Sequence, residues 1–196
     1  VEVSTDHPAM AFLAAQKAGW ELSIEGFEGL GSGPARALVA EEDEYQRIGY
    51  RDAADFAVLA IESDELPGEV VAEHVAKRAG VPTSSVFLPT FSTASVTGSV
   101  ALAARAGEIA TFRLSELGYD PLDVLTVTAS APVAPIAETD DVAMARTNDA
   151  LAYGARIHAT VDEPFERFGD VPSTARESFG TPFAEIFDDH GWDFQE

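Results

Sequence analysis

The sequence VALAARAGEIATF at residues 100–112 consists of small and apolar side chains, except for the two charged ones of Arg105 and Glu108. This composition predicts a helix that packs against other elements on most of its sides. At a spacing of three residues, the two charged side chains lie on one face of that helix, about one turn apart. Small residues flank this face, Gly107 among them, so a bulky group can approach the helix backbone closely.

The chemistry of this charged pair leaves two interpretations open. The first is an exposed ion pair within the helix, worth about 0.2–0.5 kcal/mol. The second is a partly buried carboxylate whose pKa is raised by desolvation and lowered by the neighbouring guanidinium, which is how a general base is made. The apolar surroundings, and the less favourable order of Arg before Glu in the helix dipole, weaken the first interpretation without excluding it.

The net charge narrows the class of protein. The chain has 34 acidic and 12 basic residues, for a formal net charge of −22, and its lysines are Lys17 and Lys77 alone. Nucleic-acid binding is excluded on this ground, because phosphate contacts require clustered Lys and Arg. The acidic residues are spread along the chain, which is typical of proteins from extreme halophiles, and the scarcity of lysine favours that interpretation over an ordinary acidic protein.

Other sequence features argue against membranes, metals and covalent catalysis. No apolar run approaches the length of a membrane span. The chain has no Cys, which removes disulfides, thiolate metal sites and thiol nucleophiles, and fits a cytoplasmic protein. Its four histidines show no HxxxH or HExxH spacing, and there is no GxSxG motif. We therefore expect neither a metal site nor a serine triad.

Strands and helices alternate along residues 51–160, which predicts an α/β layer with crossover connections. The predicted strands are residues 20–24, 55–61, 85–89 and 123–129; the predicted helices are residues 4–20, 41–48, 67–79, 140–153 and 182–192. The loops at residues 90–98 and 130–135 follow strand ends, where ligands usually bind in such sheets.

Two further segments are ambiguous from the residues alone. The loop GLGSGPARALV at residues 29–39 packs three glycines and a proline around Ser32. Its N–H groups, with Arg36, can hold a phosphate or carboxylate, but a tight structural turn explains it equally well. Gln16 and Lys17 fall at the last turn of the N-terminal helix, where solvated side chains that complement the helix dipole are the simpler interpretation.

Six segments, taken in order, resemble those of the archaeal methenyltetrahydromethanopterin cyclohydrolases. They are STDHPAMAFLAAQKAGW, GSGPARAL, TGSVALAARAGEIA, APVAP, TNDALAYGAR and FGTPFAEIF. Each motif is weak by itself, whereas the six in order are specific and cover about residues 5–194. Family members are longer at both ends, so the resemblance implies a truncated product.

The resemblance implies metal-free hydrolysis of the cyclic 5,10-methenyl bridge of a reduced pterin carrier to its N5-formyl form. The carrier is the substrate, and no cofactor is implied. Glu108 matches the family's general base, and Arg105 matches the arginine that orients the water and tunes the pKa of that glutamate. The matching substrate-binding residues are Ala15, Gln16, Lys17, Ser32, Gly33 and Thr97. For Gln16 and Lys17 this replaces the solvated interpretation.

The family fold implies two α/β lobes that hold the pterin between them, in a homotrimer. By this analogy residues 1–50 form part of the first lobe, residues 51–160 form the second, and residues 161–196 return to the first. The carrier is tetrahydromethanopterin or, in a halophile, tetrahydrofolate. The alternatives are a non-catalytic pterin- or anion-binding module, in which the Arg105–Glu108 pair is structural, and a fragment whose activity was lost with its ends.

Overall fold

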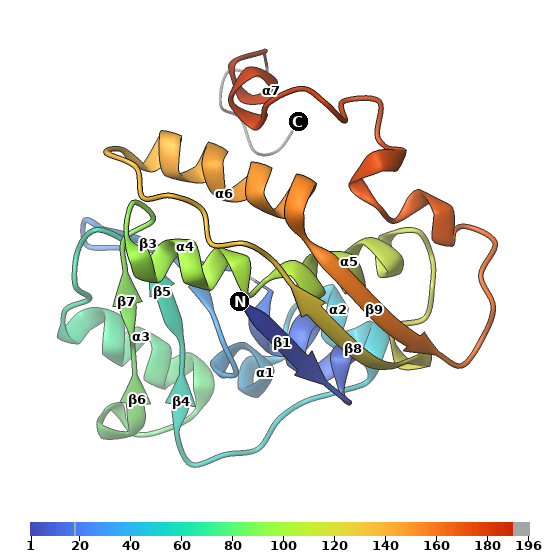
Figure 1. Ribbon diagram of the computed structural model, residues 1–196. Helices are drawn as coiled ribbons and strands as arrows, with labels where there is room; N and C mark the ends of the chain where they lie inside the picture. The colour runs from blue at the N-terminus through green and yellow to red at the C-terminus, as the bar shows by residue number, and fades with distance from the viewer. Residues whose placement is uncertain (18, 190–196) are drawn as a thin grey trace.

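The computed structural model describes residues 1–17 and 19–189 and shows an α/β fold (Figure 1). The described strands form sheets of order β1-β8-β9, β2-β3-β5-β7 and β4-β6. The strands are β1 (Glu2–Thr5), β2 (Trp20–Ile24), β3 (Phe27–Ser32), β4 (Ala57–Val58), β5 (Ala60–Glu62), β6 (Val86–Phe87), β7 (Thr90–Phe91), β8 (Val124–Ser130) and β9 (Arg156–Val161). The α-helices are α1 (Ala35–Val39), α2 (Asp43–Ile48), α3 (Glu69–Ala79), α4 (Val96–Ala103), α5 (Ala106–Glu116), α6 (Asp140–Gly154) and α7 (Phe183–Asp189). The other helices are the π-helix η1 (Ala9–Gln16) and the 3₁₀ turns η2 (Thr83–Ser85), η3 (Pro121–Asp123), η4 (Phe168–Asp170) and η5 (Ser173–Ala175).

The sheet of β1, β8 and β9 is antiparallel and supports α5. β8 lies between β1 and β9, and α5 packs against β8. Val127 and Ala129 of β8 are buried in one core with Leu114 of α5. β9 is exposed along most of its length, so this sheet buries mainly one face.

The second half of the fold is built on β2, β3, β5 and β7, with β4 and β6 pairing beside them. β2 and β3 form an antiparallel hairpin, whereas β5 pairs with β7 in parallel through a crossover that contains α3. Parallel strands need such a crossover because a tight turn cannot join them. Val71 and Val75 of α3 are buried with Leu59 and Ile61, which forms the core of this half.

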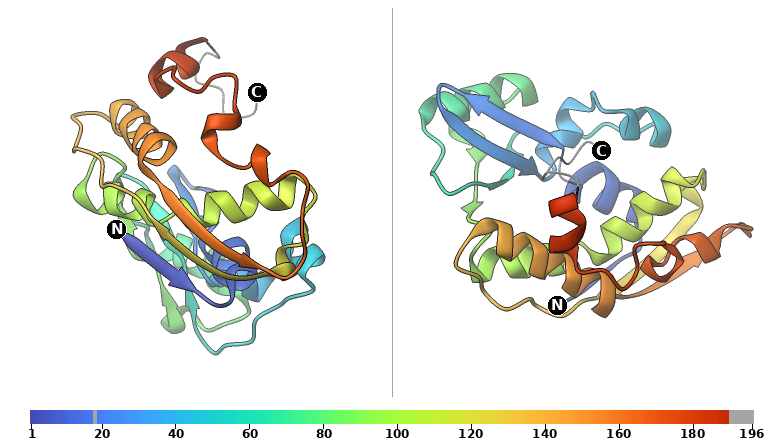
Figure 2. Two further views of the ribbon diagram at one scale, coloured as in Figure 1. Left: turned by 45° about the vertical axis from the view of Figure 1, so that its right-hand side comes forward. Right: turned by 90° about the horizontal axis from the view of Figure 1, so that it is seen from above.

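The π-helix η1 lies between the two halves (Figure 2, right). It packs against α5 on one side and against α1 and α2 on the other. Its sequence AMAFLAAQ is apolar all round, as expected for a helix that is covered on several sides. Phe12 belongs to the core under α5, while Ala9 and Ala14 are buried with Tyr45 and Ile48 of α2.

The predicted helix at residues 100–112 is two helices. α4 ends at Ala103 and α5 begins at Ala106, and between them Arg105 N donates to Leu102 O at 3.0 Å, one residue tighter than an α-helical bond. Neither Gly nor Pro marks the break, so the composition of the segment gave no signal of it. The prediction of one continuous helix was wrong at this point, which matters because Arg105 precedes α5 and Glu108 lies in its first turn.

Other elements agree in part with the prediction. Residues 20–24 and 123–129 are strands, residues 55–61 contribute to the two short strands β4 and β5, and residues 85–89 contain the short strand β6. Helices α2, α3 and α6 were predicted within a few residues. The strands β1, β3, β7 and β9 were missed: β7 begins the presumed loop at residues 90–98, and the presumed loop at residues 29–39 is mostly β3 and α1. The predicted helix at residues 182–192 contains α7, and its residues from 190 on lie outside the described part of the chain.

The sheets do not follow the predicted lobe boundary at residue 50. β3 pairs with β5 across that boundary, and β1 pairs with β8, which joins the start of the chain to the segment assigned to the other lobe. Pairing between distant segments is a tertiary property that local patterns do not encode. The existence of two lobes around a pterin stays a prediction.

The charge distribution of the folded chain leads to a test in salt. Among the side chains that the structure describes, Glu108 is the one fully buried acidic residue. The screening length grows from about 3 Å at 1 M salt to about 30 Å at 0.01 M, so repulsion within an acidic surface increases on dilution. We expect circular dichroism to show loss of helix on transfer from concentrated KCl to low salt, and its recovery when KCl is returned. An unchanged spectrum would contradict the halophilic interpretation.

None of the described helices combines the length and apolarity needed to cross a membrane.

Candidate active site

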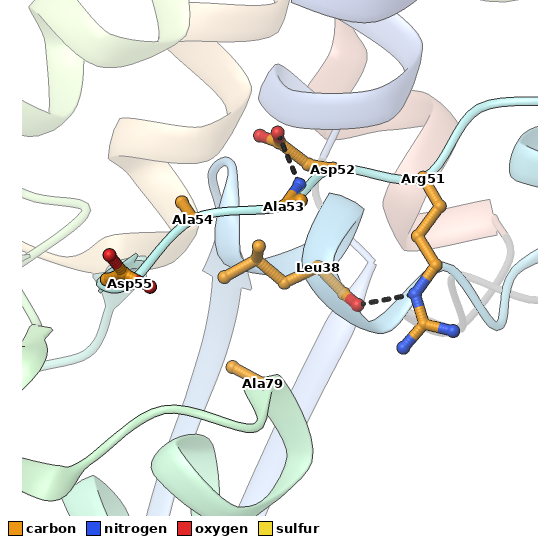
Figure 3. A pocket seen from close by; sticks show the side chains of 7 residues that line it. All are labelled: Leu38, Arg51, Asp52, Ala53, Ala54, Asp55 and Ala79. Atoms are coloured by element: carbon orange, nitrogen blue, oxygen red, sulfur yellow. Dashed lines mark hydrogen bonds between the residues drawn. The ribbon is translucent and has the colours of Figure 1, made fainter.

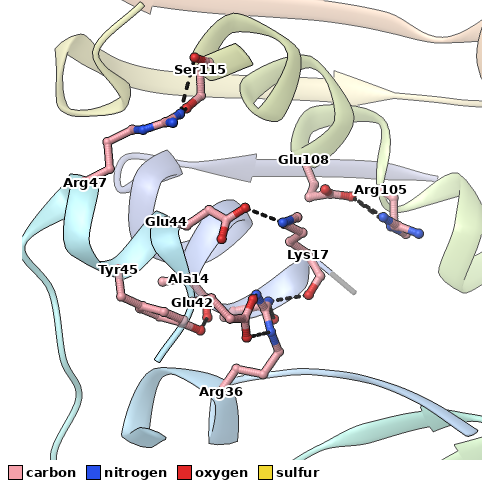
Figure 4. Close-up of polar contacts among 11 residues, drawn as sticks. Ala14, Lys17, Arg36, Glu42, Glu44, Tyr45, Arg47, Arg105, Glu108 and Ser115 are labelled. Carbon is pink, nitrogen blue, oxygen red and sulfur yellow. Dashed lines mark hydrogen bonds and ion pairs between the residues drawn. The ribbon is translucent and has the colours of Figure 1, made fainter. Parts of the chain in front are cut away.

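Polar side chains from four elements meet where η1 ends (Figure 4). The elements are the end of η1, the break between α4 and α5, helix α1 and helix α2, which lie together because η1 packs against α5, α1 and α2. The charged side chains here are Lys17, Arg36, Glu42, Glu44, Arg105 and Glu108. A chain with 12 basic residues thus places three of them around one buried carboxyl group.

The Arg105–Glu108 pair is held with both guanidinium contacts on one oxygen. Arg105 Nε and Nη2 each lie 2.8 Å from Oε2 of Glu108. The Glu108 side chain is 2% exposed and that of Arg105 is 28% exposed. The helix break places Glu108 in the first turn of α5, where the helix dipole stabilises a carboxylate, although it disfavours the Arg105 cation at the N-cap of the same helix.

The surroundings of Glu108 prepare its carboxyl group to take up a proton. Burial raises the pKa of Glu108, while the charge and hydrogen bond of Arg105, and then the charges of Lys17 and Arg36, lower it. Burial prevails, so the pKa lies above the ordinary value of a glutamate. This agrees with the second of the two interpretations of the pair, a buried carboxyl group restrained by a guanidinium.

Gly107 allows the close approach that the small residues predicted. A Cβ at this position would lie 2.7 Å from Cζ of Phe12 and 3.3 Å from Cβ of Ala129. The bulky group beside the helix backbone is therefore a side chain of η1. This contact brings η1 against the first turns of α5, next to Glu108.

Gln16 ties the end of η1 to the helix break. Its Nε2 donates to the carbonyl oxygen of Ala104 at 3.0 Å, directly before Arg105. Its Oε1 is buried and accepts no hydrogen bond from the residues that the structure describes. A buried amide oxygen of this kind is an available acceptor for a water or a substrate N–H.

The side chain of Lys17 lies near the carboxyl group of Glu108, whose pKa its charge lowers (Figure 4). Its Nζ forms an ion pair with Oε1 of Glu44 and lies 4.7 Å from the centroid of the Phe112 ring. Phe112 follows Glu108 by four residues and so shares its face of α5. The solvated interpretation of Gln16 and Lys17 is therefore wrong for both, since each is held against other elements.

Ser32 and Gly33 contact the backbone of the segment that contains Gln16 and Lys17. The Ser32 hydroxyl donates to the carbonyl oxygen of Gln16, and Gly33 N donates to that of Ala15 at 2.8 Å. The φ of Gly33 is +142°, and a Cβ there would lie 2.8 Å from the carbonyl oxygen of Val58, so the turn requires glycine. These donors contact the backbone of the protein, as the structural interpretation of the loop expects, and the assignment of Ser32 and Gly33 to substrate binding stays a prediction.

Thr97 is the one predicted site residue that the structure does not bring to the others. It is exposed in the first turn of α4, while Arg105 follows the end of that helix. Eight helical residues separate the two ends by about 12 Å along the axis. Its assignment to substrate binding stays a prediction.

Sequence reasoning named Arg36 only as a possible ligand for an anion, and it missed Tyr45, which also supports the site. Arg36 is 1% exposed, pairs with Glu42, and donates to the carbonyl oxygens of Lys17 and, at 3.4 Å, Ala15. Tyr45 donates to the carbonyl oxygen of Ala14, and burial raises the pKa of its hydroxyl. These residues are 19 or more positions away from their partners in η1, and no spacing rule links them.

A separate hollow lies apart from these residues (Figure 3). It measures about 340 Å³ and is lined by Leu38, Arg51, Asp52, Ala53, Ala54, Asp55 and Ala79. None of the predicted site residues lines it. In the part of the chain that the structure describes, no three His, Asp or Glu side chains are grouped so that they could hold a metal ion.

The fold and these side chains define an α/β protein whose site holds a buried carboxyl group, paired with an arginine and lying near a lysine. A sequence model of the family described as Cyclohydrolase (MCH) matches residues 1–196. The chain belongs to this family, as its six motifs suggested.

Three similar proteins from archaea share the name methenyltetrahydromethanopterin cyclohydrolase. A methenyltetrahydromethanopterin cyclohydrolase of Halobacterium salinarum is 58% identical over 193 residues, which are 98% of this chain and 62% of that protein. Proteins of the same name from Methanocella arvoryzae and Methanococcus maripaludis are 42% and 41% identical, over 99% of this chain and 62% of their own length. The chain thus spans 62% of the length of these relatives. The Halobacterium relative fits the halophilic interpretation of the charge.

Proposed function

We propose that this protein hydrolyses the methenyl bridge of methenyl-tetrahydromethanopterin to give 5-formyl-tetrahydromethanopterin, reversibly, with Glu108 as general base. The observation that carries this proposal is the buried carboxyl group of Glu108, paired to Arg105 and raised in pKa. The names of the relatives, which are 41–58% identical, support the substrate. A purely structural ion pair would not require a carboxyl group at this depth.

The proposed reaction requires the protein mainly to position and deprotonate a water molecule. Its bridging carbon belongs to a cationic amidinium group and is already electrophilic. The oxygen of a water bonds to that carbon while Glu108 accepts a proton from the water. The bond from this carbon to N10 then breaks, N10 takes up a proton, and one proton is released for each cation and water consumed.

Residues around Glu108 have distinct parts in this scheme. Arg105 holds the carboxylate by Oε2, and we assign the other oxygen, Oε1, to the water. The unpaired Oε1 of Gln16 accepts the second hydrogen of the water, which directs the oxygen lone pair at the carbon. In this scheme Lys17 contacts the formyl oxygen and Ala15 lines the reacting bridge, as the family resemblance implies. Ser32 and Gly33 support these residues through the backbone.

The proposed assembly is a cytoplasmic homotrimer, which the family resemblance implies. The proposed substrate lies between two lobes, and the protein uses no resident cofactor. Tetrahydrofolate is the second candidate carrier, and the halophilic character of the chain favours including it in the test.

The loss of the methenyl chromophore in concentrated KCl tests the reaction. We expect the full chain to accelerate the decay of methenyl-tetrahydromethanopterin or methenyl-tetrahydrofolate above the buffer rate, and the faster of the two identifies the carrier. Decay at the buffer rate with both carriers contradicts the proposal. Saturable binding without acceleration would indicate a pterin-binding module.

Replacing Arg105 by lysine should also reduce turnover. An ammonium group cannot reproduce the two contacts of the guanidinium with Glu108 Oε2. Loss of one charged hydrogen bond costs about 1.5–3 kcal/mol, which corresponds to a decrease of about 10- to 100-fold in kcat/KM. Arg167→Lys, in a half-exposed pair with Asp170, is the control. Equal activity of Arg105→Lys and the parent would mean that Arg105 supplies charge alone.

A further inference from the structure

We propose that Glu44 is a positioning residue for this site: it holds the Lys17 ammonium group away from the carboxyl group of Glu108. The proposal deepens the proposed function and rests on it, because Glu108 is the group that would take the proton. Glu44 was not singled out by any sequence motif. The argument follows from the ion pair, from the way α2 is anchored, and from the charges that surround Glu108.

Lys17 lies between two carboxyl groups (Figure 4). Its Nζ is paired with Oε1 of Glu44, and the charge of Lys17 also acts on Glu108. The side chains of Lys17 and Glu44 are 21% and 14% exposed, so water screens this pair weakly. The ring of Phe112 limits the ammonium group on a further side. The charge of Lys17 lowers the pKa of both Glu44 and Glu108, so Glu108 is the carboxylate to which a released Lys17 turns in this proposal.

Helix α2 is held in a position that keeps Glu44 in place. Arg47, three residues after Glu44, donates to the hydroxyl oxygen of Ser115 and, at 3.3 Å, to its carbonyl oxygen near the end of α5. Tyr45 ties the same helix to the carbonyl oxygen of Ala14. Glu44 therefore reaches Lys17 from a helix that is anchored both to α5 and to η1.

Glu44 is ionised in this arrangement. Burial raises the pKa of Glu44, but the hydrogen bond and charge of Lys17, together with the charge of Arg36, outweigh burial and lower it. Above this lowered pKa the carboxylate carries its charge and retains the Lys17 ammonium group. The two glutamates thus differ: Glu44 is held charged, while burial favours the protonated form of Glu108.

The other charged groups near Glu108 do not replace this effect. Arg105 is bound to Glu108 itself, and Arg36 is bound to Glu42. Among the elements packed against α5, η1 and β8 contribute no titratable side chain within their bounds. The titratable side chains of the remaining elements packed against α5 are Asp123 on η3 and Arg156 and His158 on β9. Arg36 is fixed further by the carbonyl oxygens of Ala15 and Lys17, whereas the Lys17 ammonium group donates to Glu44 alone among the described residues.

The test compares Glu44→Gln with Asp43→Asn, since both remove one negative charge from the first turn of α2. Asp43 is exposed, so its variant controls for net charge. The chain has two lysines, and Lys77 is exposed, so an amine-acylating reagent read by peptide mass spectrometry reports Lys17 against an internal standard. We expect Glu44→Gln to decrease the labelling of Lys17 several-fold, because its ammonium group then pairs with the buried carboxylate of Glu108, with the labelling of Lys77 unchanged and Asp43→Asn matching the parent.

The second readout is the titration of Glu108 by infrared difference spectroscopy, with Glu108→Gln subtracted to isolate its carboxyl band. A freed ammonium group favours the carboxylate, so we expect Glu108 in Glu44→Gln to titrate about 1 pH unit lower than in the parent, the low end for a nearby opposite charge. Glu44→Asp, which keeps the charge, should restore the parental titration.

Unchanged or increased Lys17 labelling in Glu44→Gln overturns the proposal, as does a titration of Glu108 that matches Asp43→Asn. A shift of the same size in Glu44→Asp also overturns it, because side-chain length and not charge would then be the cause. Neither readout requires turnover. A chain that hydrolyses neither carrier would therefore contradict the proposed function, while these measurements would still decide whether Glu44 controls Lys17.

Discussion

Replacing Glu108 by glutamine is expected to lower turnover by on the order of 10²–10⁴, the usual contribution of a positioned general base. Glutamine has nearly the same shape and retains an oxygen for Arg105, but it cannot accept the proton of the water. Binding of the carrier should change little, because the loss concerns a step that follows binding. The measurement is the decay of the methenyl chromophore in concentrated KCl, with kcat and KM determined separately.

The pH dependence provides an independent check on Glu108. The base must be ionised, and its pKa is raised, so turnover of the parent should fall with decreasing pH at a midpoint above the ordinary value for glutamate. The residual turnover of Glu108→Gln should lack this acid limb. Glu116→Gln, at an exposed position of the same helix, is the matched control and should behave as the parent. Undiminished hydrolysis by Glu108→Gln would remove Glu108 from the mechanism.

Replacing Arg36 by methionine should cause the largest loss of stability among these variants. The Arg36 side chain is fully buried, pairs with Glu42, and donates to the carbonyl oxygens of Ala15 and Lys17. Methionine fills similar apolar volume but leaves these acceptors without their donor. Breaking a buried pair from one side costs about 3–5 kcal/mol. Glu42 is 30% exposed and can be hydrated, so we expect about 3 kcal/mol.

Urea denaturation in concentrated KCl measures this loss as a change in the free energy of unfolding. Arg167→Met is the control, because both side chains of the Arg167–Asp170 pair are 52% exposed and such pairs contribute at most about 1 kcal/mol. Equal losses in the two variants would contradict the part assigned to Arg36. The comparison separates a buried network from a surface ion pair of the same chemical type.

Residues close together in the sequence explain why the Arg105–Glu108 pair could be predicted. A spacing of three residues brings two side chains together in almost any helix, and the small, apolar neighbours indicate burial. The break at Ala104 does not disturb this spacing, since Arg105 and the residues after it stay in the right-handed helical region. The pair was therefore predicted correctly although the helix that carries it was not.

Lys17 and Gln16 show where local reasoning fails. By composition they belong to the polar end of a helix, and their assignment to substrate binding, which stays a prediction, came from the family resemblance. Gln16 is bound to Ala104, 88 residues away, and Lys17 to Glu44, 27 residues away. Such contacts exist because η1 is inserted between α5 and α2, which is a consequence of packing and not of periodicity.

Composition, periodicity and short spacing were sufficient to predict the α/β class, the acidic character and the charged pair at residues 105 and 108, and the order of six motifs was sufficient for the family. The pairing of β1 with β8, the helix break before Arg105, and the binding of Lys17 by Arg36 and Glu44 became evident in the folded chain alone. Burial and charge at a site depend on segments that are distant in the sequence and are brought together by folding. The pKa of Glu108 is set by this burial and by cations from three separate parts of the chain.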